Sequence, residues 1–217
     1  MKEKNMIAYL NKPKIKSDII VQLKAHAKAD EIIKGQYWQN GKGCAIGCTI
    51  HSGNHAEYEK RFGIPETVAH LEDAIFEGLP NGKSKTWPVR FMSAIQVGMD
   101  MTLVWPKFAI WLLRGIIPKK TKEKEVLSVI DGVSILYERW IATGVKPADK
   151  EFDKAAWATW AARAAEAAGA TWAAGATWAA RAAWAAGAPG ATGATWDEYW
   201  IMCADKLIEI IKGCPIP

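Results

Sequence analysis

The chain has 217 residues, of which 50% are hydrophobic and 24% are charged, and its formal net charge is +5. A chain of this length can bury a sizeable core, and this composition is typical of a globular protein. The basic clusters at 11–16 and 119–124 lack interleaved aromatic residues, which argues against a nucleic-acid partner. The cysteines are too few for a disulfide scaffold, so a reducing cytoplasm is expected; they are Cys44, Cys48, Cys203 and Cys214.

Neither a secretory signal nor a membrane span is predicted. The first ten residues carry charges without a long apolar stretch behind them. The most apolar segment, 108–117, is too short to cross a bilayer and contains Arg114. We therefore interpret it as a core helix and expect no membrane partner.

Apolar residues at helical spacing predict a mainly α fold. The expected helices cover 14–34, 65–79, the segments opened by Pro88 and Pro106, 124–140, and a last helix starting at Thr195. No segment shows period-two alternation bounded by hairpin turns, so no sheet is expected. We expect one integrated domain, with an N-terminal helical body over 1–147 and an alanine- and tryptophan-rich layer with a C-terminal amphipathic helix over 148–217.

The tract from Ala155 to Trp196 is built of triplets with alanine in first place. Five of its tryptophans are separated by multiples of six residues, so on a helix they visit several faces: Trp160, Trp172, Trp178, Trp184 and Trp196. A helix that is apolar all round is either buried or shared between subunits, which makes a homo-oligomer reasonable. Expansion of a short codon repeat explains the same pattern and stays open beside this structural interpretation.

The segment 41–55 holds four potential metal ligands at helical spacing: Cys44, Cys48, His51 and His55. Thiolate and imidazole are good zinc ligands, but four ligands along one straight helix span about 16 Å. One ion cannot collect them all, although the two histidines could share an ion with His26 or His70. The alternative to a metal site is a purely structural one, in which these residues form the buried face of a helix and free cysteine behaves as a small hydrophobic residue.

A third interpretation of this segment is a site for a small anionic ligand. Gly41, Lys42 and Gly43 form a turn before an expected helix N-terminus, where free backbone N–H groups and the helix dipole attract phosphate or carboxylate. These residues and the amide of Cys44 would hold phosphate. Two histidines, His51 and His55, would contact a base or sugar, and Tyr37 or Trp38 would stack on it.

Enzymatic chemistry is the weaker interpretation. A cysteine–histidine pair is available in Cys44 or Cys48 with His51, and this pair allows a cysteine- or metal-dependent hydrolase. No nucleophile elbow or kinase-type loop exists. The acidic residues Glu72 and Asp73 are interpreted as part of a solvated helix face. No catalytic residue and no cofactor is therefore assigned.

The segments "GKGCAIGCTIH" and "LEDAIFEGLP", followed by the alanine-rich triplets, resemble helical bacterial and phage proteins of unassigned activity. The triplet tract also resembles a group of helical, alanine-rich immunity proteins. The resemblance implies a role in bacterial defence or in a phage's response to it. The leading hypothesis is a non-enzymatic protein that binds a small anionic molecule, such as a nucleotide or a nucleotide-derived signal. The alternative is an inhibitor or immunity protein that binds a protein partner through a tryptophan-rich helical face.

Overall fold

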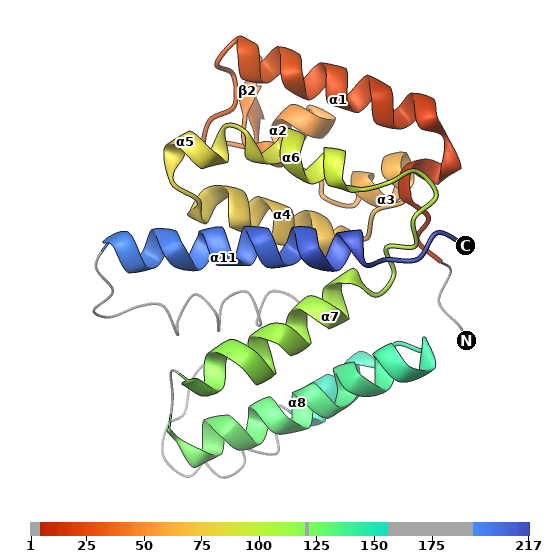
Figure 1. The fold of residues 1–217 in the computed structure, drawn as a ribbon, viewed down its shortest axis with the longest axis vertical. Helices are drawn as coiled ribbons and strands as arrows, with labels where there is room; N and C mark the ends of the chain where they lie inside the picture. The colour runs from red at the N-terminus through yellow and green to blue at the C-terminus, as the bar shows by residue number, and fades with distance from the viewer. Residues whose placement is uncertain (1–4, 120–121, 156–192) are drawn as a thin grey trace. The chain divides into compact units, whose positions relative to one another are not determined.

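The computed structural model describes residues 5–119, 122–155 and 193–217 (Figure 1). Most of these residues are helical, which confirms the mainly α class. The chain divides into two compact units. The first unit comprises 5–104 with the C-terminal helix, and the second comprises 105–119 and 122–155. The proposed alanine- and tryptophan-rich layer falls mostly at 156–192, outside the described residues, and the division at residue 147 stays a prediction.

The first unit contains short helices and one small hairpin. Its elements are η1 (Ala8–Asn11), α1 (Pro13–Lys28), β1 (Trp38–Gln39), β2 (Lys42–Gly43), α2 (Ala45–Ile50), α3 (Glu57–Phe62), α4 (Glu66–Gly78), α5 (Asn81–Ser84), α6 (Trp87–Ala94) and α11 (Gly193–Lys212). Helix α7 (Val104–Ile110) begins at the last residue of 5–104.

Helix α2 lies at the centre of the first unit. It packs against α1, α4 and α6, and all six of its residues are buried. The sequence AIGCTI explains this position, because a helix made of small and apolar residues is stable only when it is covered on every side. Helix α11 packs against α4 and α6 (Figure 1). Gly78 permits the contact with α4, since a Cβ atom there would lie 2.1 Å from the Trp200 ring.

The positions of proline and of the apolar stripes predicted several of these helices correctly. Pro65 immediately precedes α4, and Pro88 is the second residue of α6. The expected apolar face of α4 is buried: Val68, Leu71, Ile75, Phe76 and Leu79. The last helix begins at Gly193, two residues before the predicted start. Its expected apolar face is also buried: Trp200, Cys203, Leu207, Ile208 and Ile211.

The prediction of one helix over 14–34 is wrong at its C-terminal end. Helix α1 ends at Lys28, and Asp30 has a left-handed backbone with φ of 55°. The chain then runs extended, and Ile32 is buried and forms a parallel bridge with Gly43. The apolar Ile32 fits the helical period of the sequence, but its burial comes from pairing with a distant segment.

The expectation of no sheet is also wrong, because β1 and β2 form a short antiparallel hairpin. Trp38 pairs with Gly43 and Gln39 with Lys42. The two residues between the strands, Asn40 and Gly41, have φ of 53° and 78°. Positive φ at both positions is the requirement of a type I′ turn, for which Asn-Gly is a favoured sequence. Each strand is two residues long, which is too short for an alternation of apolar and polar residues to be recognised in the sequence.

The second unit contains η2 (Trp111–Ile116, π-helical), η3 (Ile117–Lys119) and α8 (Lys124–Thr143), which follow α7. Within it, Trp105 Nε1 donates a hydrogen bond to Tyr137 Oη at 3.2 Å. Arg114 pairs with Glu138 at 3.0 Å. Within the described residues, no helix combines the length and the apolar character that a membrane span requires.

Candidate metal centre

Cys44 lies at the N-terminus of α2 and is buried. Its Sγ accepts a hydrogen bond from Gly47 N at 3.5 Å, so the cysteine acts as the cap of this helix. Its side chain is 1% exposed. A cap of this kind requires an acceptor atom on a short side chain, which cysteine provides as a weak substitute for serine.

The backbone amides next to this cap are not free, contrary to the sequence-based expectation. Gly43 N donates to Glu31 O at 3.0 Å, and Cys44 N donates to Gln36 O at 2.7 Å. Both amides are therefore occupied by carbonyl oxygens of the segment that precedes the hairpin. Two of the groups expected to hold phosphate cannot do so without breaking these bonds.

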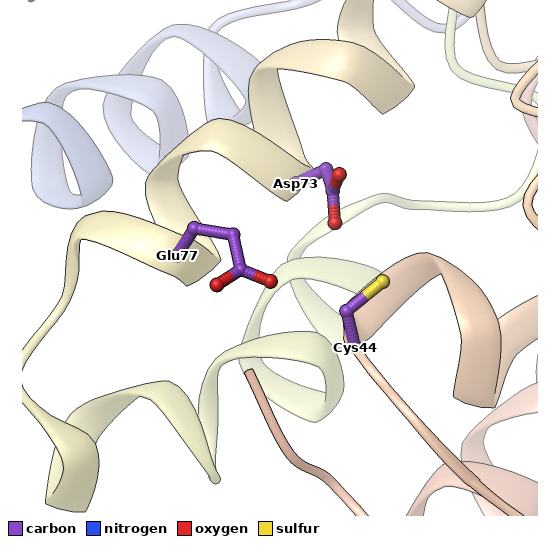
Figure 2. Close-up of side chains that lie close together, drawn as sticks. All are labelled: Cys44, Asp73 and Glu77. Carbon is purple, nitrogen blue, oxygen red and sulfur yellow. The ribbon is translucent and has the colours of Figure 1, made fainter. Parts of the chain in front are cut away.

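Two carboxylates of α4 lie beside the Cys44 thiol (Figure 2). Asp73 and Glu77 are four residues apart, so the helix presents them on the same face. One carboxylate oxygen of each and Cys44 Sγ all lie within 4.8 Å of one another. Figure 2 shows the three side chains converging from α4 and from the start of α2.

A fourth side chain, His55, approaches Asp73 from the turn after α2. Its Nε2 lies 3.4 Å from Asp73 Oδ2, within the range of an ion pair but without the geometry of a hydrogen bond. The side chain is only 6% exposed, and its Nε2 has no hydrogen-bond partner. Asp73 Oδ1 is also buried without a partner. Buried polar atoms are nearly always hydrogen-bonded, so an added ligand at these two atoms would gain interactions that the protein alone does not supply.

Aromatic contacts hold the His55 ring in place. The ring stacks on His70 with centroids 3.9 Å apart and 15° between the planes. Tyr37 meets it edge-on at 5.5 Å. Tyr37 itself is 51% exposed, so it forms the solvent side of this contact. These contacts fix the ring without satisfying Nε2.

The electrostatics of the cluster oppose a second negative charge. Burial raises the pKa of the Cys44 thiol well above its usual value, and the charge of Asp73 raises it further. Burial also raises the pKa of Glu77, although bonds from Gly35 N to its carboxylate oppose this effect. The thiol is therefore protonated in the metal-free protein. A bound cation would reverse this balance, because metal ligation favours the thiolate.

The structure gives little support to a cysteine nucleophile. Burial raises the pKa of Cys48 to about 12, and its Sγ donates to the Gly43 carbonyl at 3.3 Å. Reactive cysteines are accessible and have a lowered pKa. Neither Cys44 nor Cys48 meets these conditions.

The expected metal ligands Cys48, His51 and His55 have different partners. Cys48 bonds backbone carbonyl oxygens, and His55 faces Asp73. His51 caps the C-terminus of α2 with a left-handed φ of 56° and lies against His26. Helix α2 ends at Ile50, so His51 and His55 do not lie on one continuous helix. Each histidine thus pairs with a residue from another element instead of sharing one ion.

Sequence analysis missed the carboxylates. Asp73 was interpreted as part of a solvated helix face together with Glu72, yet Glu72 is fully buried and Asp73 is half-buried. The signal in the sequence was the pair of carboxylates at i and i+4 on α4, on a helix that carries several apolar residues. Their position beside Cys44 depends on how α2 packs against α4, which spacing alone does not reveal.

The charges around Lys42 also differ from the expectation of an anion site. Lys42 lies exposed on β2, while the side chains that converge next to the cap are the acidic pair and the cysteine. The donor set is one sulfur, one imidazole nitrogen and two carboxylate oxygens.

Comparison of the chain with protein-family models, with curated proteins and with solved structures finds no match.

Proposed function

We propose that the protein binds a divalent transition-metal ion of the zinc class through Cys44, Asp73, Glu77 and His55. The observation that carries this proposal is the convergence of Cys44, Asp73 and Glu77, with the buried His55 Nε2, which makes no hydrogen bond, 3.4 Å from Asp73. Zinc accepts sulfur, nitrogen and carboxylate ligands together in a four-coordinate site. Softer and harder ions are favoured by all-sulfur or all-oxygen sites, respectively.

The spacing of the donor atoms supports a site that closes on binding. Donors of a tetrahedral zinc ion lie about 3.3–3.7 Å apart, given bonds of 2.0–2.3 Å. The three atoms of the cluster lie within 4.8 Å of one another, and His55 Nε2 is 3.4 Å from Asp73. Rotations of the Asp73 and Glu77 side chains would shorten their distances to Cys44 Sγ, and His55 would complete the site from the side of Asp73.

The position of the site in the fold indicates what the ion would do. Its ligands come from the cap of α2, the turn that follows α2, and the middle and end of α4. An ion shared by these segments binds the folded unit and not the unfolded chain, so it stabilises the fold. Glu77 is the exposed ligand, while Cys44 and His55 are buried, so the ion would enter from the side of Glu77.

Titration of the metal-free protein with Co²⁺ tests the proposal. Cobalt occupies zinc sites and gives a charge-transfer band when a thiolate is a ligand. We expect this band in the parent protein and its loss in Cys44→Ser and in the near-isosteric Asp73→Asn. The matched controls are Cys214→Ser, a buried thiol near the C-terminus, and His70→Gln, which stacks on His55 but is not a proposed ligand.

Circular dichroism of the two ligand variants shows whether each is still helical. Loss of the charge-transfer band can then be distinguished from loss of the fold. A parent protein that binds no Co²⁺ or Zn²⁺ would overturn the proposal. The same conclusion would follow from a charge-transfer band that persists in a folded Cys44→Ser variant.

A further inference from the structure

We infer that His26 and His51 form a second metal site, suited to a borderline ion such as Cu²⁺ or Zn²⁺. This site shares no ligand with the one proposed above, so either can exist without the other. Imidazole nitrogen is the donor that these ions accept most readily in proteins.

The two imidazoles face each other with the atoms that would bind the ion. His26 Nε2 and His51 Nε2 share a hydrogen bond at 3.0 Å, which an ion would replace, and the rings meet edge to face with centroids 5.2 Å apart. Two histidines on one ion with bonds of 2.0–2.1 Å hold their nitrogens roughly 2.9–3.4 Å apart. The observed separation falls in this interval, although the residues come from α1 and from the end of α2.

Glu31 orients the first of these rings. Its Oε2 lies 2.6 Å from His26 Nδ1. A carboxylate accepts its hydrogen bond from a protonated ring nitrogen, so this contact favours the tautomer with a proton on Nδ1 and directs Nε2 toward His51. This carboxylate–histidine pair is the usual support behind a metal-binding histidine.

Trp38 holds both rings from one side. It stacks on His51 with centroids 4.3 Å apart and 20° between the planes, and it meets His26 edge-on at 5.5 Å. The ring positions are therefore set before any ion arrives. The His26–His51 contact lies at the exposed surface, so water or an external donor can complete the coordination.

The probe is Cu²⁺ added to the Cys44→Ser, Asp73→Asn double variant, in which the first proposed site is removed. Electron paramagnetic resonance should show coupling to two nitrogens. The affinity should fall at least tenfold in His26→Gln and in His51→Asn, and asparagine is chosen because it tolerates the left-handed backbone of residue 51. Glu31→Gln should weaken binding about tenfold. His70→Gln is the matched control and should bind as before.

Calorimetry with Zn²⁺ separates this site from the first. With both sites present the parent binds two ions, and the Cys44→Ser, Asp73→Asn variant binds one. If only the first proposal fails, the parent binds one ion and that variant still binds one. Unchanged copper affinity in a folded His51→Asn variant, or coupling to a single nitrogen, would overturn the inference.

Discussion

Gly47 of α2 lies directly against the backbone of Tyr37: a Cβ atom on Gly47 would be 1.3 Å from the Tyr37 carbonyl oxygen. Gly43 makes a similar approach, with a separation of 1.9 Å from the same atom. The glycines therefore let the backbone at Tyr37, just before β1, lie close against β2 and α2. Both candidate metal sites border this contact, because Tyr37 touches His55 and Trp38 touches His51.

Gly47→Ala should destabilise the protein by about 3 kcal/mol, although alanine is the better helix former. The added methyl group meets a backbone atom, which cannot move aside as a side chain can. Urea unfolding should show a lower midpoint with an unchanged slope. Gly82→Ala is the control, since a Cβ atom there meets nothing within 4 Å and its φ is not positive. A Gly47→Ala variant as stable as Gly82→Ala would contradict the close approach.

Zn²⁺ should raise the thermal midpoint of the parent protein, with a stabilisation of about 3 kcal/mol at a hundredfold excess over Kd. Cys44→Ser and Asp73→Asn should each lose most of this gain. Zinc binding should also weaken as pH falls, because the Cys44 thiol, whose pKa is raised, must release its proton. One released proton gives about a tenfold change in affinity per pH unit. An affinity independent of pH would exclude Cys44 as a ligand.

Glu72 should make stability depend on pH in the opposite sense from an ordinary surface carboxylate. Burial is the main reason that its pKa rises to about 8, and the charge of Asp73 contributes to this rise. The Tyr58 hydroxyl, which donates to Oε2 at 2.7 Å, opposes it. A raised pKa means that the folded protein holds a proton which the unfolded chain releases above its ordinary value of 4.5. The stabilising contribution is therefore complete below pH 4.5 and is lost as pH rises through 8.

Glu72→Gln keeps the shape of the side chain but removes this titration. In the presence of a chelator, the variant should gain stability relative to the parent between pH 4 and 9, on the order of 3 kcal/mol. Chemical unfolding across this pH range measures the difference. Glu209→Gln, at an exposed position of α11, should follow the parent at every pH.

The bonded amides of Gly43 and Cys44 lead to an expectation about anions. A thermal-shift screen of nucleotides on the metal-free protein should show no stabilisation, and Lys42→Ala should behave as the parent does. A nucleotide that stabilises the parent but not Lys42→Ala would instead support the small-anion hypothesis. That hypothesis stays a prediction until the screen is done.

The sequence was sufficient for the helices whose burial follows from local pattern. The apolar stripe of α4 and the proline before it predicted both its position and its buried face. The hairpin was missed, although Asn40-Gly41 is a strong turn signal, because strands of two residues cannot show alternation. Ile32 was assigned to a helix because a residue buried by pairing with Gly43 has the same apolar character as one on a helix face.

The candidate sites depended still more on tertiary packing. Sequence spacing singled out Cys44, His51 and His55, and it named His26 and His70 as histidines that could join them. It could not show that His26 lies against His51, because that contact requires α1 to pack on α2. It also placed Asp73 and Glu72 in solvent, because a charged residue in a helical sequence does not indicate which other element will cover it.

The proposed ligands of both centres lie between residues 26 and 77, well ahead of α11. During synthesis this stretch leaves the ribosome before the C-terminal helix exists, although α11 later covers part of α4. The nascent chain therefore contains every proposed ligand before α11 covers its part of α4. An ion would bind at that stage only where α2 and α4 already pack together, because the proposed first site needs ligands from both segments.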